Sequence, residues 1–148
     1  DLMGRKTVRN NGELLKVLLA QMDTFTSTQQ TVKAMQPYLE VFAESRQLLV
    51  ETTDAIIGRA AENPDEVGAA SYAYMELMGM TLHCFMWLRI LAACIEEISA
   101  ESGDHDYLCG LIKTGEFFLS RMLPKSKAMV EEIAAGAASM MGLTAEQF

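Results

Sequence analysis

Apolar residues recur at spacings of three and four along most of the chain, which is the period of an amphipathic α-helix. A first helix is predicted from a face that consists of Leu15, Leu18, Met22, Phe25 and Val32. Asn11 is its expected N-cap, ahead of Gly12 and Glu13. The stretch from Thr24 to Thr31 is poor in strong helix formers, so the pattern leaves the end of this helix open.

A second helix is predicted to begin at Pro37, because proline fits the first helical position. Its apolar face consists of Tyr38, Phe42, Leu49 and Ile56. The next boundary is Asn63-Pro64-Asp65-Glu66, which is close to a capping box. A third helix then runs to Ser102, with Gly103 ending it, and spans roughly 57 Å if unbroken.

A fourth helix is expected after Asp104, a suitable N-cap. Its apolar positions are Leu108, Leu111, Phe118, Met122, Met129, Ile133 and Met140. Pro124 falls inside this pattern and should kink or split the helix. The connections near 33–37, 63 and 103 are short, which makes consecutive helices antiparallel neighbours. The prediction is an all-α, up-down-up-down four-helix bundle with a long third and a kinked fourth helix.

The segment 77–95 is apolar enough to raise the question of a membrane span. Arg89 would be costly in lipid, and the flanking Glu76, Glu96 and Glu97 lack the basic bias of a topology signal. We therefore expect no membrane partner and assign the segment to the core or to a subunit interface. Arg89 is expected to reach solvent or to pair with a carboxylate, with contact to an anion or a partner as the alternative.

Composition narrows the class of protein. The chain has 148 residues, half of them hydrophobic, which suits one domain with its own core. Its net charge of −8 argues against a nucleic-acid partner, whose phosphates need clustered basic residues. Three widely spaced cysteines are not a disulfide framework, so we expect reduced thiols and a cytoplasmic location.

Metal-binding patterns are weak. Glu-x-x-His pairs, which build di-iron sites in helical bundles, do not occur in the sequence. His105 and Cys109 share a helical face, near Asp104 and Asp106, but no second pair completes a tetrahedral zinc site. A small-ligand or metal-binding bundle based on these two residues is therefore the weakest of the functional hypotheses. The pair His83-Cys84 is expected to be a packed histidine beside a buried thiol.

Catalytic signatures are equally sparse. The sequence contains no phosphate-binding loop, dinucleotide fingerprint or CxxC motif. Gly110 and Gly115 are expected to let two helices approach closely. The basic cluster of Arg5, Lys6 and Arg9 could meet a phosphate, but a solvated helix end is the simpler interpretation. The methionines either fill the core or line an adaptable groove: Met75, Met78, Met80, Met86, Met122, Met129, Met140 and Met141.

Three segments resemble a known family. The opening Asp1-Leu2-Met3-Gly4-Arg5-Lys6, followed by Asn11-Gly12, is similar to the stretch after the catalytic helical domain in acyl-CoA dehydrogenases of the 3-methylmercaptopropionyl-CoA dehydrogenase type. The segments 74–91 and 116–129 resemble two helices of that family's C-terminal extension. The matching positions are Tyr74, Leu77, Gly79, Met86-Trp87, Phe117-Phe118 and Leu123-Pro124.

The resemblance implies residues 1–10 as the tail of a preceding catalytic domain and 11–148 as an accessory helical extension domain. Enzymes of that family oxidise the Cα–Cβ bond of an acyl-CoA with FAD, through a glutamate and flavin contacts that lie upstream. The chain would then have been cut from a longer protein, as its mid-helix opening also suggests. No catalytic, cofactor-binding or metal-binding residue is assigned here.

The expected partners are the chain's own upstream catalytic domain and further copies of itself, through the third or the first helix. The alternative is a stand-alone, self-associating bundle with a scaffold or regulatory role. Trp87 lies either in the core or against a missing partner.

Overall fold

The computed structural model describes residues 1–7 and 12–147, and every regular element in these ranges is helical. The all-α class predicted from the sequence is therefore confirmed. The longer helices are α1 (Glu13–Gln29), α2 (Gln36–Ala60), α3 (Asp65–Ser99), α4 (His105–Phe117) and α5 (Ser126–Ala134). Short elements are η1 (Leu2–Thr7), η3 (Lys33–Met35), η4 (Phe118–Met122), η5 (Leu123–Lys125), α6 (Ala138–Met141) and η6 (Ala145–Gln147).

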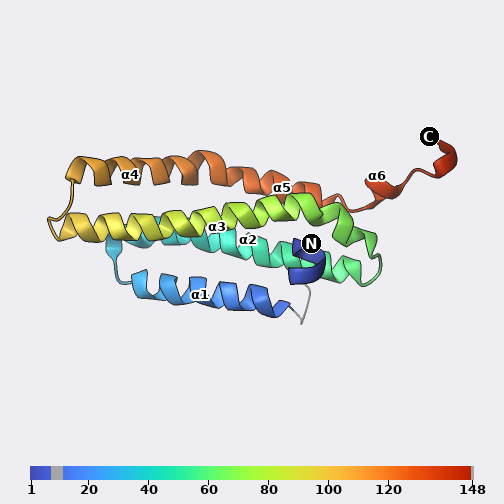
Figure 1. Cartoon of the computed structure of the whole chain (residues 1–148), viewed down its shortest axis with the longest axis horizontal. Helices are drawn as coiled ribbons and strands as arrows, with labels where there is room; N and C mark the ends of the chain where they lie inside the picture. Colours follow the sequence, from blue (N-terminus) through green and yellow to red (C-terminus); the bar gives the residue numbers. More distant parts are fainter. Residues whose placement is uncertain (8–11, 148) are drawn as a thin grey trace.

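The long helices run in alternating directions, as the short connections predict (Figure 1). In Figure 1, α3 lies between α1 and the α4–α5 segment, and α2 lies behind α3. Helix α3 packs against α2, α4 and α5, so it is the central element of the fold. The closed four-helix arrangement remains a prediction.

The core consists of two clusters of buried side chains along α3. One gathers near η1 and α5: Met3, Leu15, Leu49, Ile56, Tyr74, Leu77 and Ile133. The other lies toward the opposite end: Met22, Met35, Phe42, Cys84, Leu88, Leu91 and Leu123. Buried hydroxyls of α2 and α3 pair with one another, as burial requires. The Thr53 and Tyr74 hydroxyls lie 2.8 Å apart, and those of Ser45 and Thr81 lie 3.1 Å apart.

The first helix is longer than its composition suggests. Gly12 precedes it in the left-handed conformation, with a φ of 73°, while the expected N-cap Asn11 lies outside the described residues. The Thr24 and Ser27 hydroxyls donate to carbonyls four residues back, at 2.8 and 2.7 Å. These bonds satisfy the hydroxyls within the helix. Val32 lies beyond the end of α1, so its placement on the first helix was wrong.

The α2–α3 boundary follows the predicted pattern only in part, because Pro64 stands at the N-cap of α3 and Glu66 bonds to Arg59 and the Ala137 N–H instead of closing a capping box. Helix α2 begins at Gln36, one residue before Pro37, and the Asn63 side chain accepts a hydrogen bond of 3.1 Å from the Asp65 N–H. Helix α3 ends at Ser99, three residues before the predicted Ser102. The chain turns there because Glu101 has a φ of 51°, a conformation that no helix contains.

The predicted fourth helix is divided. The Asp104 side chain accepts a hydrogen bond of 3.2 Å from the Tyr107 N–H, as an N-cap should. The helix then breaks into η4 and η5 around Pro124 before α5 begins, as the proline predicts. Helix α5 ends at Ala134 because Gly136 takes a φ of 71°. Met140 therefore lies in the separate α6, and its assignment to the fourth helix was wrong.

Candidate functional site

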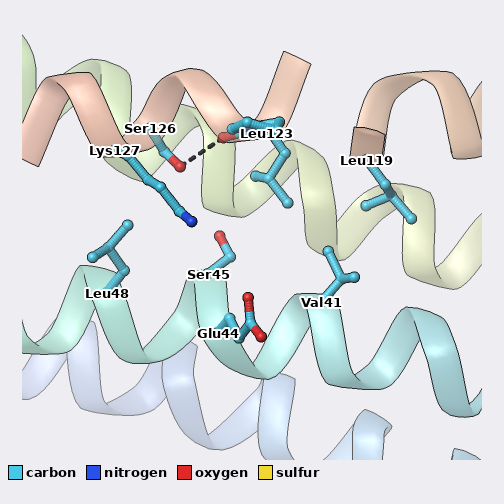
Figure 2. Close-up of a pocket in the computed structure, with 9 residues that line it drawn as sticks. Val41, Glu44, Ser45, Leu48, Leu119, Leu123, Ser126 and Lys127 are labelled. Atoms are coloured by element: carbon cyan, nitrogen blue, oxygen red, sulfur yellow. Dashed lines mark hydrogen bonds between the residues drawn. The ribbon is translucent and has the colours of Figure 1, made fainter. Parts of the chain in front are cut away.

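The break at Pro124 leaves a hollow of about 300 Å³ between α2 and the α4–α5 segment. Figure 2 shows the side chains that line it from both sides. Its walls are mostly apolar, and Glu44 and Lys127 supply its charges. The residues that line it are Val41, Glu44, Ser45, Leu48, Leu119, Leu123, Pro124, Ser126 and Lys127.

The two hydroxyls of this hollow are already engaged. Ser126 donates a hydrogen bond of 2.6 Å to the Leu123 carbonyl (Figure 2). Ser45 pairs with Thr81 in the core. Glu44 and Lys127 are the titratable side chains of the lining, and neither forms a hydrogen bond with Ser45 or Ser126. The hollow therefore presents two engaged hydroxyls and two charged side chains that do not contact them.

The basic cluster predicted near the start of the chain is only partly described. Arg5 and Lys6 both form ion pairs with Asp1. The Lys6 Nζ lies 3.4 Å from the Asp1 Oδ2. Asp1, which directly precedes η1, thus partly neutralises their charges. Arg9 lies outside the described residues. Because Arg5 and Lys6 pair with Asp1, a phosphate would have to compete with the Asp1 carboxylate for them.

The candidates on α3 occupy different environments. Arg89 is exposed and forms no ion pair with a described residue. Cys84 is buried, as predicted, and burial raises the pKa of its thiol to about 12. His83 is exposed on the same helix, with its ring edge-on to Phe118 at 6.1 Å between centroids. The histidine therefore packs on the protein surface and not beside the thiol in the core.

His105 and Cys109 do come together on α4. The Cys109 Sγ lies 3.8 Å from the His105 Nδ1. Asp104 is already used as the N-cap, and Asp106 lies 4.0 Å from the same imidazole nitrogen. Within the described part of the chain, no three His, Cys, Asp or Glu side chains converge as a metal site would need. All three cysteines are free thiols.

The two α4 glycines differ. A Cβ on Gly115 would lie 3.1 Å from both Leu91 Cδ2 and Trp87 Cε3, so the absence of a side chain lets α3 and α4 approach closely. Gly110 has open space at the corresponding position. The expectation of close helix contact thus holds for Gly115 and is wrong for Gly110. Trp87 itself is half-buried, between Phe118 and the surface.

The methionines divide between core and surface. Met78 is buried, whereas Met75, Met86, Met140 and Met141 are exposed. A second hollow lies next to Gly79, between the solvent-exposed side of α3 and η4. Three half-buried or exposed methionines line it: Met75, Met80 and Met122. The adaptable groove considered from the sequence therefore exists in part, on the outer face of α3.

Sequence reasoning missed a polar clamp that joins three helices. The Arg59 guanidinium donates to Glu66 Oε2 at 3.0 Å and to the Ile133 carbonyl at 2.9 Å. Glu66 Oε1 accepts a hydrogen bond of 3.0 Å from the Ala137 N–H. The clamp therefore ties the end of α2 and the start of α3 to the end of α5. The contacts to the Ile133 carbonyl and the Ala137 N–H join residues 74 and 71 positions apart, so no local spacing could have indicated them.

A second missed contact joins α2 to α4. The Tyr38 hydroxyl donates a hydrogen bond of 2.8 Å to Glu116 Oε1. Burial and this hydrogen bond to a carboxylate raise the pKa of Tyr38 to about 12. The contact holds the start of α2 against the end of α4, which is a structural role.

The geometry defines an all-helical domain built around α3. The sequence model of the family described as acetyl-CoA dehydrogenase C-terminal like matches residues 18–144. The chain belongs to this family. A comparison with curated proteins gives no match. The segments 74–91 and 116–129 lie within the matched range, whereas the resemblance at the start of the chain lies outside it.

Proposed function

We propose that the chain is the accessory C-terminal domain of an FAD-dependent acyl-CoA dehydrogenase. The family match over residues 18–144 carries this proposal. The parent enzyme would be of the 3-methylmercaptopropionyl-CoA dehydrogenase type and would oxidise the Cα–Cβ bond of an acyl-CoA. Residues 1–10 would end the catalytic domain, and 11–148 would form the extension. The proposed location is cytoplasmic, without nucleic acid or membrane as a partner.

The hollow at the helix break does not suit FAD. The hollow at the helix break, at about 300 Å³, is at the lower limit of pockets for much smaller ligands. Its one cationic side chain is Lys127, while a dinucleotide pyrophosphate calls for a cradle of backbone N–H groups or several cations. We therefore place the flavin, the catalytic glutamate and the acyl-CoA in the upstream body, and no chemical step on this chain.

The outer face of α1 is the surface that we assign to the catalytic body. Leu14 and Val17 are 63% and 54% exposed, and their spacing of three residues places them on one face of the helix. Helix α1 follows η1, the first described element, so an upstream body would join the domain near the start of α1 (Figure 1). Docking there would cover both side chains.

Calorimetry would test this proposal in two parts. The 148-residue chain should bind neither FAD nor a short acyl-CoA, and micromolar binding of either would contradict the proposal. The chain should bind the separately expressed catalytic body that the same gene encodes upstream. Leu14→Glu should weaken that binding, whereas Tyr107→Glu should not, although both side chains are 63% exposed. A gene without an upstream flavoprotein would also end the proposal.

A stand-alone, self-associating bundle remains the second candidate. The observation that favours self-association is the exposed apolar surface of α3, and it applies whether or not a catalytic body precedes the chain.

A further inference from the structure

The outer face of α3 is more apolar than its burial explains. By length and composition, α3 is the one helix among the described residues that could span a membrane, yet only 33% of its most apolar stretch is buried. Tyr72, Gly79, Met86 and Ala93 follow one another at intervals of seven residues on this face. Tyr72 is 67% exposed and Met86 49% exposed. A seven-residue repeat is the spacing with which two helices pack along their length.

This outer face of α3 carries a hole and a knob. A Cβ on Gly79 would meet no atom within 4 Å, and an open hollow of about 480 Å³ lies beside it. Trp87 and Phe118 form part of the wall of this hollow. Met86 projects from the same helix two turns later, about 10.5 Å along the axis. The side chain of Met86 has the shape and the chemistry that such a hollow accepts.

We propose that a second copy of the chain packs antiparallel on this face, about a twofold axis near residues 82 and 83. In such a pair, residues at equal distances from the axis meet. Met86 of each copy then enters the hollow beside Gly79 of the other. By the same symmetry, the large Tyr72 lies opposite the small Ala93. The contact is isologous and therefore closes as a dimer.

Two charged residues on this face support the same antiparallel alignment of the two copies. Glu76 and Arg89 are both exposed, and neither forms an ion pair within the described part of its own chain. They lie at equal distances from the proposed axis, so the dimer brings Glu76 of each copy opposite Arg89 of the other. The dimer therefore contains two Glu76–Arg89 ion pairs, one on each side of the twofold axis. A lipid surface would instead bury Glu76, His83 and Arg89 without partners, which is costly.

A charge-swap experiment tests the partner and the register together. Sedimentation equilibrium of the 148-residue chain over a wide concentration range should show a reversible dimer. Glu76→Arg or Arg89→Glu places like charges opposite each other twice, so each should raise the dimer dissociation constant about tenfold. The double variant Glu76→Arg/Arg89→Glu should restore dimerisation. Glu131→Arg and Lys113→Glu make the same changes of net charge on α5 and α4, and should leave it unchanged.

A second pair of variants tests the knob and the hole. Gly79→Met fills the hollow and Met86→Ala removes the knob, so each should weaken the dimer by roughly tenfold or more. Gly110→Met is the matched control, because Gly110 also has open space on an exposed helix surface. Circular dichroism should show that all three variants remain folded.

Three results would overturn the inference. A monomer at every concentration would show that this face does not bind a second copy. A dimer that tolerates all of the α3 variants would place the interface elsewhere. Loss of the dimer in the single charge variants without rescue in the double variant would exclude the antiparallel register. The inference does not rest on the proposed function, and a monomer would leave that proposal standing.

Discussion

The close approach of α3 and α4 at Gly115 allows a sharp test of the packing. Gly115→Ala adds one methyl group, whose carbon would lie 3.1 Å from both Leu91 Cδ2 and Trp87 Cε3. Leu91 is fully buried, so it has little room to move. Overpacking of this kind costs about 1–3 kcal/mol. Alanine also gains about 0.5–1 kcal/mol over glycine inside a helix.

Gly110→Ala separates these two effects. Gly110 lies on the same helix, and its new methyl group would meet no atom within 4 Å. This variant should therefore show the helix gain alone and be more stable than the parent by about 0.5–1 kcal/mol. The Gly115 variant should be less stable by up to about 2.5 kcal/mol. The difference between the two variants measures the packing cost alone, about 1–3 kcal/mol.

Urea unfolding at one protein concentration, followed by far-UV circular dichroism, gives both free energies. Trp87 is the single tryptophan of the chain, and its ring would touch the new methyl group at position 115. Its fluorescence should therefore shift in Gly115→Ala and stay constant in Gly110→Ala. Equal stabilisation of the two variants would refute the close packing of α3 against α4.

Two further predictions concern the clamp and the buried thiol. Arg59→Met should lower the free energy of unfolding by about 1–3 kcal/mol in urea melts, because it removes the donor to Glu66 Oε2 and to the Ile133 carbonyl. As a control, Arg121→Met at an exposed position should change the free energy of unfolding by less than about 0.5 kcal/mol. Equal effects of the two substitutions would contradict the clamp. Burial raises the pKa of the Cys84 thiol from 9.0 to about 12. As the pH rises, the unfolded chain therefore loses this proton before the folded chain does. The free energy of unfolding should then fall by up to about 1.4 kcal/mol per pH unit between the two pKa values. Cys84→Ala should show a shallower fall in alkaline urea melts, and an unchanged slope would contradict the burial of the thiol.

Local signals in the sequence predict much of this fold, because caps and helix breakers act within a few residues. Asp104 caps α4 and Pro37 lies at the start of α2, as their residue types require. Pro124 divides the last helical segment for the same local reason. The end of α5 could not be predicted in this way. Gly136 lies among alanines that favour a helix, and its turn is held by Glu66, which lies far away in the sequence.

The candidate surfaces were less accessible to sequence reasoning. Periodicity marks α3 as apolar on every side, but it does not say which side the neighbouring helices leave uncovered. His83 illustrates the difficulty: it is flanked by core residues in the sequence, yet it lies exposed against Phe118. The hollow beside Gly79 depends on Phe118 and Met122 of the segment after α4, so it exists only once the helices have packed.

The two exposed apolar surfaces differ in a way that bears on their partners. The α1 face offers Leu14 and Val17 without a partner of opposite shape or charge on the same helix. The α3 face is complementary to itself about one midpoint: a large residue lies opposite a small one, a hole opposite a knob, and Glu76 opposite Arg89, each pair at equal distances from that midpoint. A surface that binds its own copy about a twofold axis must be self-complementary in this way, whereas a surface that binds a different protein need not be. For this reason we assign the catalytic body to α1 and the second copy to α3.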